Sequence, residues 1–342
     1  MKIIKKLTVL LVILFMLTGC TTNKVYISYS VYPIGYLLNK IGGNKIQTIS
    51  VQTNDLVQVA EAKQSSDEEE GFSEIIANSQ YFLHIGTLEP YLDIYEDDIY
   101  SSGAEVIDLS TLNTTYKFQR YTLVRSNNVD TYIESPYYEG SCFDSVDTYG
   151  NDLFLWLDPI GMLSMAKDVY NLLSSNYVEQ AAYFKENYDA LETQLISLDA
   201  NFQTLANKCK TNNVAIKFAC MTPSFGSWQK SYGIQIYPIC LSKYGTLPTD
   251  EQLAIIKQRL IDDGVKYIAY EPNMTPEMTE LFNSLVEELG LTRVNLSNIS
   301  SLTQTQSEAG KDYLTLMYEN YNVLEAIYNA LVEENNTNDS DE

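Results

Sequence analysis

An apolar stripe on one long helix is the strongest constraint in this sequence. From Tyr177 to Lys208 there is neither Pro nor Gly, and seven apolar residues recur at spacings of three and four: Phe184, Tyr188, Leu191, Leu195, Leu198, Phe202 and Leu205. This pattern predicts one buried face of a helix rather than a strand. At 1.5 Å per residue, an unbroken helix here spans roughly 45 to 50 Å, more than one small domain needs. We therefore expect residues 159–210 to form two successive helices, of which the second links two lobes.

Short β-rich runs alternate with helical stretches on both sides of that segment. Residues 25–158 form the predicted N-terminal lobe, and residues 211–331 the C-terminal lobe. Predicted strands lie at 25–30, 46–51, 81–85 and 105–108, then at 214–220, 234–239, 266–270 and 292–296. Predicted helices lie at 33–41, 72–79 and 88–95, then at 225–232, 249–263, 276–289 and 313–331.

This alternation implies crossover connections and parallel sheets covered on both faces. The predicted fold is therefore α/β, with two lobes, each a four-stranded parallel sheet flanked by helices, joined by one long rigid helix. Ligands of open parallel sheets bind beyond the carboxyl ends of the strands, so both sets of strand ends are expected to face a shared cleft.

Four segments fall outside the alternating pattern. The acidic run at 64–70 and the stretch at 127–152, rich in Tyr, Ser, Gly and acids, are predicted to be exposed loops. Residues 116–125 between them predict an additional strand. The last residues, 332–342, predict an acidic disordered tail.

The N-terminus has the features of a lipoprotein leader. Three lysines precede an apolar run at 7–17, which is too short for a comfortable membrane span. The following Leu17-Thr18-Gly19-Cys20 resembles a bacterial lipobox. We expect a signal peptide at 1–19, cleavage before Cys20, an acyl chain such as palmitate on its thiol, and a tether at 20–24. The alternative is a signal anchor with a chance cysteine. The mature protein is expected on the extracytoplasmic face of the bacterial cell membrane.

The charge of the chain excludes one class of partner. The formal net charge is −23, and loss of the three leader lysines takes it to −26. Such a surface repels nucleic acid, and it either attracts cationic ligands or serves solubility. The chain has one His and no phosphate-binding glycine loop, so neither a Ser-His-acid triad nor a nucleotide site is predicted. We expect a protein that is not an enzyme and has no cofactor.

Four cysteines follow Cys20, at Cys142, Cys209, Cys220 and Cys240. Outside the membrane they are able to pair. Cys220 and Cys240 end consecutive strands that are expected to be neighbours, so a disulfide between them is the first expectation, ahead of two buried thiols. A soft metal site of Cys220, Cys240 and Glu271 is a third alternative.

The order of several motifs resembles one family, the metal-ion (zinc and manganese) class of ABC-transporter solute-binding lipoproteins. SYSVYPIGYLLNKIGGNKIQTISV at 28–51 resembles the opening of that family, and YFLHIGTLEPYLD at 81–93 resembles its strand followed by Glu-Pro-Trp. NDLFLWLDP at 151–159 resembles Asp-Pro-His-x-Trp-Leu-Asp-Pro, and PSFGSWQKSYGI at 223–234 resembles an aromatic helix ending in Tyr-Gly. YIAYEP and KDYLTLMYENYNVLEAI resemble its last strand and terminal helix. The resemblance covers nearly the whole mature chain.

This resemblance also shows where the chain departs from the family. Family members hold the metal with three or four side chains, usually His with a carboxylate. Here those positions fall on Phe154, on Thr222, on Ser297 or Asn298, and near Gln64 or Ser65. None of these supplies an imidazole, and transition metals need His, thiolate or carboxylate donors. No side chain is therefore predicted as a metal ligand, and zinc or manganese as the cargo is implied by the resemblance alone.

Four other side chains are candidates for the cleft. His84 lies within a strand, where a hydrogen-bonded core or rim histidine is the main expectation and a ligand the alternative. Glu271 closes a strand of the second lobe and could cap a helix or accept hydrogen bonds. Glu89 opens the Glu-Pro motif. Tyr32 lies among tyrosines that form either an aromatic wall for a sugar, peptide or amine, or ordinary packing.

The resemblance implies a solute-binding protein of an ABC importer that captures its ligand between the lobes. It would dock as a monomer to a permease and its ATPase in the cytoplasmic membrane. The alternative is a diverged relative that binds no metal and serves as an adhesin, as an accessory lipoprotein or as a binder of an organic solute.

Overall fold

The computed structural model describes residues 26–53, 62–64, 66, 70–111, 113–127, 129–146, 150–242, 246–272 and 274–340. The predicted leader, the predicted lipidation site Cys20, the predicted tether and Ser65 lie outside these residues. In the part that is described, no helix is long and apolar enough to cross a membrane.

The N-terminal lobe is built on a parallel sheet with the order β2-β1-β3-β4. Its strands are β1 (Tyr26–Tyr29), β2 (Thr48–Ser50), β3 (Ser79–His84) and β4 (Glu105–Asp108). The helices are α2 (Tyr32–Gly42), α3 (Phe72–Ala77) and α4 (Glu96–Ser102). Position 35 of α2 requires glycine, because a Cβ there would lie 2.3 Å from the ring of Tyr29.

The C-terminal lobe repeats this plan with the sheet order β10-β9-β7-β8, again all parallel. Its strands are β7 (Lys217–Cys220), β8 (Gln235–Pro238), β9 (Tyr267–Tyr270) and β10 (Thr292–Asn295). The helices are α7 (Ser227–Tyr232), α8 (Asp250–Asp262), α9 (Pro276–Leu289) and α10 (Gln304–Glu308). Thr249 and Thr275 cap α8 and α9 with their hydroxyl groups, as the sequence before each helix suggests. The predicted α/β fold of two four-stranded lobes is confirmed.

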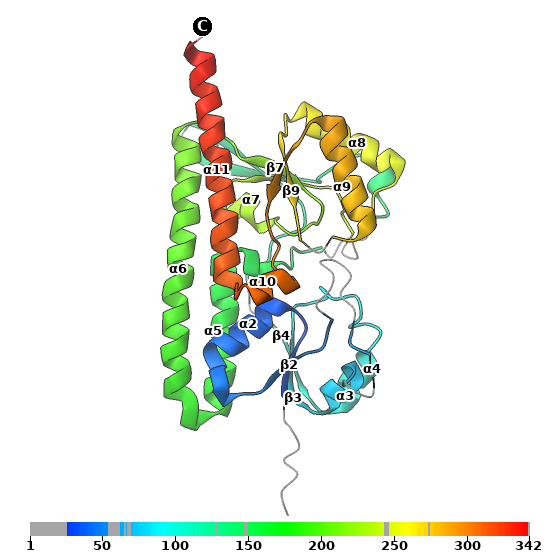
Figure 1. Cartoon of the computed structure of the whole chain (residues 1–342), viewed down its shortest axis with the longest axis vertical. Coiled ribbons are helices and arrows are strands. Elements are labelled where there is room, and N and C mark those ends of the chain that lie inside the picture. The colour runs from blue at the N-terminus through cyan, green and yellow to red at the C-terminus, as the bar shows by residue number, and fades with distance from the viewer. Residues whose placement is uncertain are drawn as a thin grey trace, which may run out of the picture.

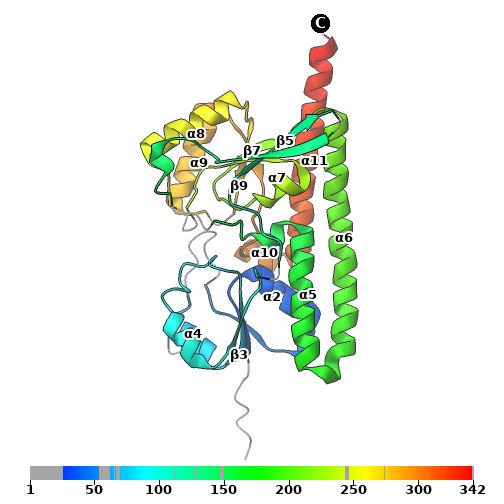
Figure 2. The ribbon, with the colours of Figure 1, turned by 180° about the vertical axis from the view of Figure 1, so that it is seen from behind.

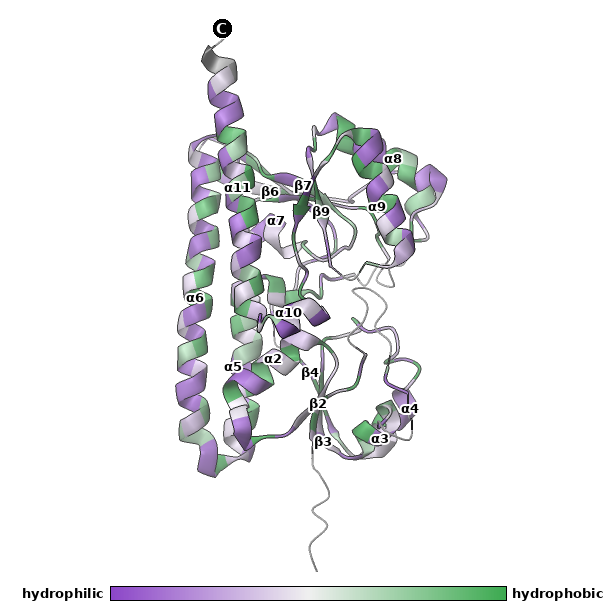
Figure 3. Cartoon of the chain, in the orientation of Figure 1, coloured by the Kyte–Doolittle hydropathy of each residue, from purple (hydrophilic) through white to green (hydrophobic). Residues whose placement is uncertain are grey.

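Three helices lie on one side of the molecule, and the longest of them runs past both lobes (Figures 1 and 2). These are α5 (Pro159–Asn176), α6 (Ala181–Thr211) and α11 (Tyr313–Ser340), and a short turn at Val178–Gln180 separates α5 from α6. The predicted stripe on α6 is confirmed, since all seven of its residues are buried. Apolar and polar residues accordingly alternate along α6 in Figure 3. The stripe belongs to a single hydrophobic core that takes in residues of both lobes.

The predicted helix at 88–95 is wrong. These residues form consecutive turns, in which the amide of Leu92 donates to the carbonyl of Glu89 and that of Tyr95 to the carbonyl of Tyr91. The helix begins only at Glu96, where three acidic residues occupy its first turn. Negative side chains stabilise the positive end of the helix dipole, so this start is electrostatically favourable.

The predicted exposed loop at 127–152 is also wrong in part. Strand β5 (Arg120–Ser126) continues into β6 (Val129–Ser135), and the two form an antiparallel hairpin. Tyr137 and Tyr138 behind the hairpin are buried in a core cluster of the C-terminal lobe, and the Tyr138 hydroxyl donates to the carbonyl of Pro238 at 2.9 Å. This part of the predicted N-terminal lobe therefore packs on the C-terminal lobe, which only tertiary contacts reveal.

The predicted disordered tail is helical as far as Ser340, because α11 continues past residue 331. Lys266 forms an ion pair with Glu334, and the Thr337 hydroxyl donates to the carbonyl of Glu333. Residues 332–340 therefore extend a helix that is already nucleated by packing further upstream.

Candidate functional site

The two lobes meet where the chain leaves the carboxyl ends of their strands. The indole Nε1 of Trp156 donates to the carbonyl of Asn298 at 2.7 Å, and the Tyr313 hydroxyl donates to the carbonyl of Trp156 at 2.6 Å. The ring of Tyr36, from α2, lies 5.4 Å from the ring of Tyr313. The junction is thus built by α2, by the Trp156 segment, by the segment after β10 and by the start of α11.

A buried polar cluster lies at the strand ends of the C-terminal lobe. The amide of Thr222 donates to Glu271 Oε1 at 2.9 Å, and the Thr222 hydroxyl donates to Oε2. Asn298 Nδ2 reaches the same Oε2 at 3.3 Å and Ser224 Oγ at 3.4 Å. Thr222 and Ser224 also share a hydroxyl hydrogen bond. Three candidates that follow different strands, Thr222, Glu271 and Asn298, therefore come together.

Burial controls the protonation of the carboxyl group in this cluster. Glu271 has no exposed surface, and its burial raises its pKa to about 7, although the hydrogen bonds from Thr222 work in the opposite direction. Desolvation destabilises the charged carboxylate by more than two or three hydrogen-bond donors stabilise it. Near neutral pH the Glu271 site is therefore poised to take up or release a proton.

The segment after β10, which carries Asn298, has a strained backbone at the next residue. Ile299 has φ of +56°, which is rare for a β-branched residue. Its amide donates to Ser297 Oγ, and Ser300 donates to Asn298 Oδ1 at 2.9 Å. Asn320 of α11 accepts from the Ser297 amide and donates to its carbonyl, both at 2.8 Å. Such strain persists only where neighbours enforce it, and it concentrates at functional sites.

Phe154 occupies the position where the resemblance places a histidine. Its ring packs against Trp156 with centroids 5.1 Å apart, and its amide donates to Asp152 Oδ1 at 3.0 Å. Burial raises the pKa of Asp152 to about 7. A pocket of about 280 Å³ beside them is lined by Phe154, Asp152 and Asp158 together with Tyr116 and Ser227. Phe154 therefore closes the wall between the core and this pocket.

His84 ends β3 in the N-terminal lobe. Its Nδ1 lies 3.0 Å from the carbonyl of Gly86, and its ring stacks on Phe82 with centroids 5.6 Å apart. It is half-buried. The histidine is therefore a hydrogen-bonded rim residue of the N-terminal lobe, as the main expectation had it.

Glu89 is the most unusual acid of the N-terminal lobe. It is 2% exposed, and neither of its carboxylate oxygens has a hydrogen-bond partner among the described residues. Burial raises its pKa to about 8, the nearby Ser30 hydroxyl and the backbone of Glu89 itself work in the opposite direction, and the charge of Asp108 adds a smaller rise. The buried Ser30 hydroxyl beyond β1 likewise lacks a partner in the described part of the chain. Glu89 is therefore best accommodated as the neutral acid.

The other candidates of the N-terminal lobe serve packing and local hydrogen bonding. Tyr32 is partly buried and packs near Tyr36, with ring centroids 6.4 Å apart, and burial raises its pKa. Gln64 is exposed and donates to the carbonyl of Ala62 and to the Tyr95 hydroxyl, each at 3.3 Å. The tyrosines of β1 and α2 thus contribute to the core. This corresponds to ordinary packing, the second of the two roles considered for them, rather than to an aromatic wall for a ligand.

The expected disulfide between Cys220 and Cys240 is wrong, since both are free thiols, as are Cys142 and Cys209. Cys220 pairs across the sheet with Pro238 rather than with Cys240. Its side chain belongs to the core that both lobes share, whereas Cys240 belongs to the second cluster, within the C-terminal lobe. Burial raises the pKa of Cys240 to about 12 and also raises that of Cys220.

No group of three or more His, Cys, Asp or Glu side chains among the described residues is arranged to hold a metal ion. The proposed soft site of Cys220, Cys240 and Glu271 is therefore not formed. At the Glu271 cluster the donors are one carboxyl group, two hydroxyls and one amide. This set lacks the imidazole and thiolate donors that zinc sites use.

Several residues of the junction were missed from the sequence. Ser224, Trp156, Asn320 and Tyr313 make the hydrogen bonds described above, yet no spacing or charge pattern distinguishes them. The family resemblance pointed to Thr222 and Asn298, and the position at the end of a strand pointed to Glu271. The partners that orient these three come from other parts of the chain.

Comparison with known families identifies the relatives of this fold. The model of the family described as "Zinc-uptake complex component A periplasmic" (ZnuA) matches residues 27–327. The chain belongs to this family. The likeness therefore covers both lobes and the helices that connect them.

Individual relatives are similar to parts of the sequence or to the fold. The chain is 26% identical over 173 residues to the zinc-binding protein AdcA of Streptococcus pyogenes serotype M6, over 51% of this chain but only 32% of AdcA. It thus spans about a third of the length of that relative. The fold is similar to the Zn(II)-bound ZnuA-like domain of Streptococcus pneumoniae AdcA, with a TM-score of 0.63, 18% identity, and 89% and 98% of the two chains covered. It is also similar to a mutant of the laminin-binding adhesin Lmb of Streptococcus agalactiae, with a TM-score of 0.65, 16% identity, and 89% and 98% covered.

Proposed function

We propose that this protein is the solute-binding component of an ABC importer of the metal-ion class. It is anchored by a lipid on Cys20 to the extracytoplasmic face of the membrane, where it acts as a monomer. It captures cargo between its lobes and delivers it to a permease and its ATPase, without catalysing a reaction. Membership of the ZnuA family and the two-lobed fold support this role.

One observation carries the proposal. Thr222, Glu271 and Asn298 lie beyond the carboxyl ends of three strands, where the C-terminal lobe meets Trp156 and Tyr313. Ligands of open parallel sheets bind at this edge. The stripe of α6 is packed into a core that takes in both lobes, so large lobe rotations are disfavoured and capture depends on small local movements.

The chemistry of the cluster limits the cargo. Its described donors are oxygens, and oxygen donors suit manganese better than zinc. A cation at Glu271 would replace the hydrogen bonds from Thr222 and Asn298, and it would displace the proton that burial favours. We therefore infer a metal cargo that binds more tightly as the pH rises through 7.

Deleting the gene for this protein tests the function in the cell. In metal-poor medium, cells without the protein should contain less manganese or zinc than the parent, measured by elemental analysis, because uptake loses its capture step. The intact gene should restore the content, whereas a Cys20→Ser variant should not, since it lacks the lipid anchor. Unchanged contents of both metals would contradict a metal cargo.

Restoring imidazole donors tests the position of the site. The triple variant Phe154→His, Thr222→His, Asn298→Asp should bind Zn²⁺ at least about a hundredfold more tightly than the parent, because it supplies the donors that zinc prefers. Calorimetric titration of both proteins measures this. The single variant Thr222→Val, which leaves Phe154 and Asn298 unchanged, is the control without new donors and should show no gain. Equal zinc affinities in parent and His variant would place the site elsewhere.

A further inference from the structure

A second pocket lies at the opposite edge of the C-terminal sheet from the Glu271 cluster. Its volume is about 380 Å³, which is within the range of small-molecule sites. Lys217 and Gln235 line it, and they are the paired first residues of β7 and β8. The hairpin strand β5 and the last turns of α6 supply the other walls. The pocket is therefore at the amino-terminal edge of the strands, away from the lobe junction.

The charge of this pocket is opposite to that of the protein. Four cations line it, namely Arg120, Arg125, Lys210 and Lys217, against a single acid, Asp263. The whole chain carries a net charge of −23. Arg125 and Lys210 share one carboxylate, that of Asp130, at 2.7 and 3.3 Å. A concave surface lined by excess positive charge concentrates field lines and attracts anions.

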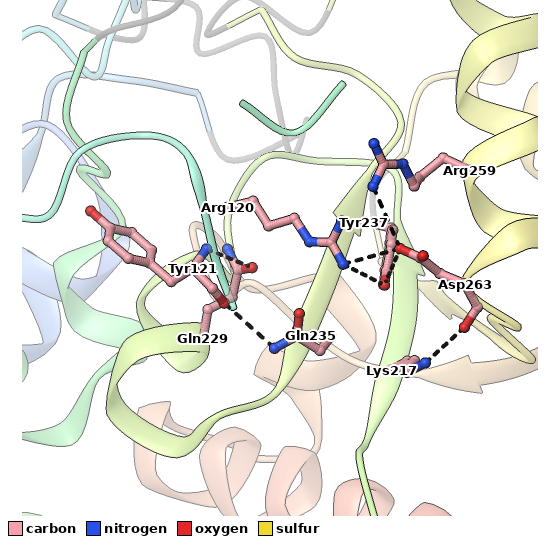
Figure 4. A network of polar contacts seen from close by, with 8 residues as sticks. All are labelled: Arg120, Tyr121, Lys217, Gln229, Gln235, Tyr237, Arg259 and Asp263. Atoms are coloured by element: carbon pink, nitrogen blue, oxygen red, sulfur yellow. Dashed lines mark hydrogen bonds and ion pairs between the residues drawn. The ribbon is translucent and has the colours of Figure 1, made fainter. Parts of the chain in front are cut away.

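Arg120 is held in place for such a ligand. Its Nη2 donates to Asp263 Oδ2 at 3.0 Å and to the Tyr237 hydroxyl at 3.3 Å, and its guanidinium carbon lies 5.3 Å from the centroid of the Tyr237 ring (Figure 4). Its side chain is only 14% exposed. Its Nε is buried and has no hydrogen-bond partner within the described chain. A guanidinium fixed on one side and unsatisfied at Nε is arranged to bind a carboxylate or phosphate.

Two other side chains complete the polar lining. Lys217 Nζ donates to the carbonyl of Asp263 at 2.8 Å, a neutral acceptor that leaves the ammonium charge uncompensated (Figure 4). Gln235 is 8% exposed, and its Oε1 has no partner in the part of the chain that the structure describes. Its Nε2 donates to the carbonyl of Tyr121 at 3.4 Å, which orients the amide. An unpaired acceptor thus lies in the same pocket as the unpaired donor of Arg120.

We propose that this pocket binds a small anion, an organic carboxylate or a phosphate, through Arg120 and Lys217. A hydroxyl or amine donor on the ligand pairs with Gln235. The site is separate from the lobe junction, and it is independent of the cargo proposed above.

Titration calorimetry of the purified full chain with citrate, and separately with inorganic phosphate, tests the site. At least one probe should bind with one site per chain, and its affinity should fall as sodium chloride is added. Preference for one probe distinguishes a carboxylate from a phosphate ligand. Lack of saturable binding of either probe at millimolar concentration would overturn the proposal.

Matched variants locate the binding. Lys217→Gln and Arg120→Lys should each lower the affinity about tenfold or more, the latter because lysine keeps the charge but loses the planar fork. Arg293→Lys is the control for arginine, since Arg293 also lies over a tyrosine ring, that of Tyr270. Lys185→Gln, on α6, controls for loss of one charge. Equal losses in the controls would show a general charge effect and overturn the proposal.

Discussion

Replacing Glu89 with glutamine is expected to stabilise the protein by about 4 kcal/mol at pH 9 and by less than about 1 kcal/mol at pH 5. Glu89 is buried without a hydrogen-bond partner among the described residues, and burial raises its pKa from 4.5 to about 8. The carboxyl group is therefore neutral in the folded protein at pH values where the unfolded chain has already ionised it. Glutamine has nearly the same shape as the neutral acid and carries no charge at any pH.

The sign of this effect follows from the raised pKa. The contribution of Glu89 to stability is fully present below pH 4.5, and it is lost as the pH rises to about 8. Urea denaturation of parent and variant between pH 5 and 9 measures the difference. Asp152 and Glu271, whose pKa values are raised to about 7, affect the pH dependence of stability equally in parent and variant. The difference in stability between the two proteins therefore reports on Glu89.

An exposed glutamate provides the control for this experiment. Glu186 lies on the solvent face of α6, and Glu186→Gln should follow the parent within about 0.5 kcal/mol across the pH range. A pH-independent difference between the parent and Glu89→Gln would contradict the buried, unpaired carboxyl. So would a variant less stable than the parent at pH 9, because it would show that the ionised form has a stabilising partner.

Truncating Phe202 to alanine should lower the free energy of unfolding by about 3 to 5 kcal/mol. Phe202 lies on the buried stripe of α6 and is 1% exposed. Its ring centroid lies 5.6 Å from that of Trp228, 5.0 Å from that of Tyr232 and 5.7 Å from that of Tyr321. Alanine would leave a cavity where α6, α7 and α11 meet, and it would remove three aromatic contacts at once. Urea denaturation monitored by circular dichroism measures the loss.

Ile196 on the same helix is the matched control. It is 51% exposed, so Ile196→Ala should change the free energy of unfolding by no more than about 0.5 kcal/mol. Both substitutions place alanine, a good helix former, in the interior of α6, so helix propensity does not explain a difference between them. Comparable losses in the two variants would contradict the assignment of the buried face.

Much of the fold could be predicted because its signals are local. The stripe from Phe184 to Leu205 required a helix with one buried face, and every stripe residue is buried. The strand at 105–108 was predicted with the bounds of β4, and the parallel sheets followed from the alternation of strands and helices. Periodicity is a property of residues that are close in sequence, so it can be recognised without knowing the tertiary contacts of the rest of the chain.

The candidate site could be predicted only as a set of positions. Thr222, Glu271 and Asn298 were expected at strand ends, and the structure brings them into one cluster. That cluster is held by Ser224, while Trp156 and Asn320 orient the segment after β10, and these three have no distinguishing pattern. Glu89 was only one candidate among several, and its burial without a partner is visible only in three dimensions.

The sequence by itself determined the helix that joins the lobes, the parallel orientation of the strands within each lobe and the shortage of imidazole donors, because composition and periodicity are set before folding. Tertiary structure decided the rest. It placed the hairpin from Arg120 to Ser135 on the C-terminal lobe, and it kept the thiols of Cys220 and Cys240 in different core clusters. It also gathered four cations beside β7 in an acidic protein. Each of these outcomes depends on which segments, distant in sequence, pack against one another, and no local sequence pattern specifies that packing.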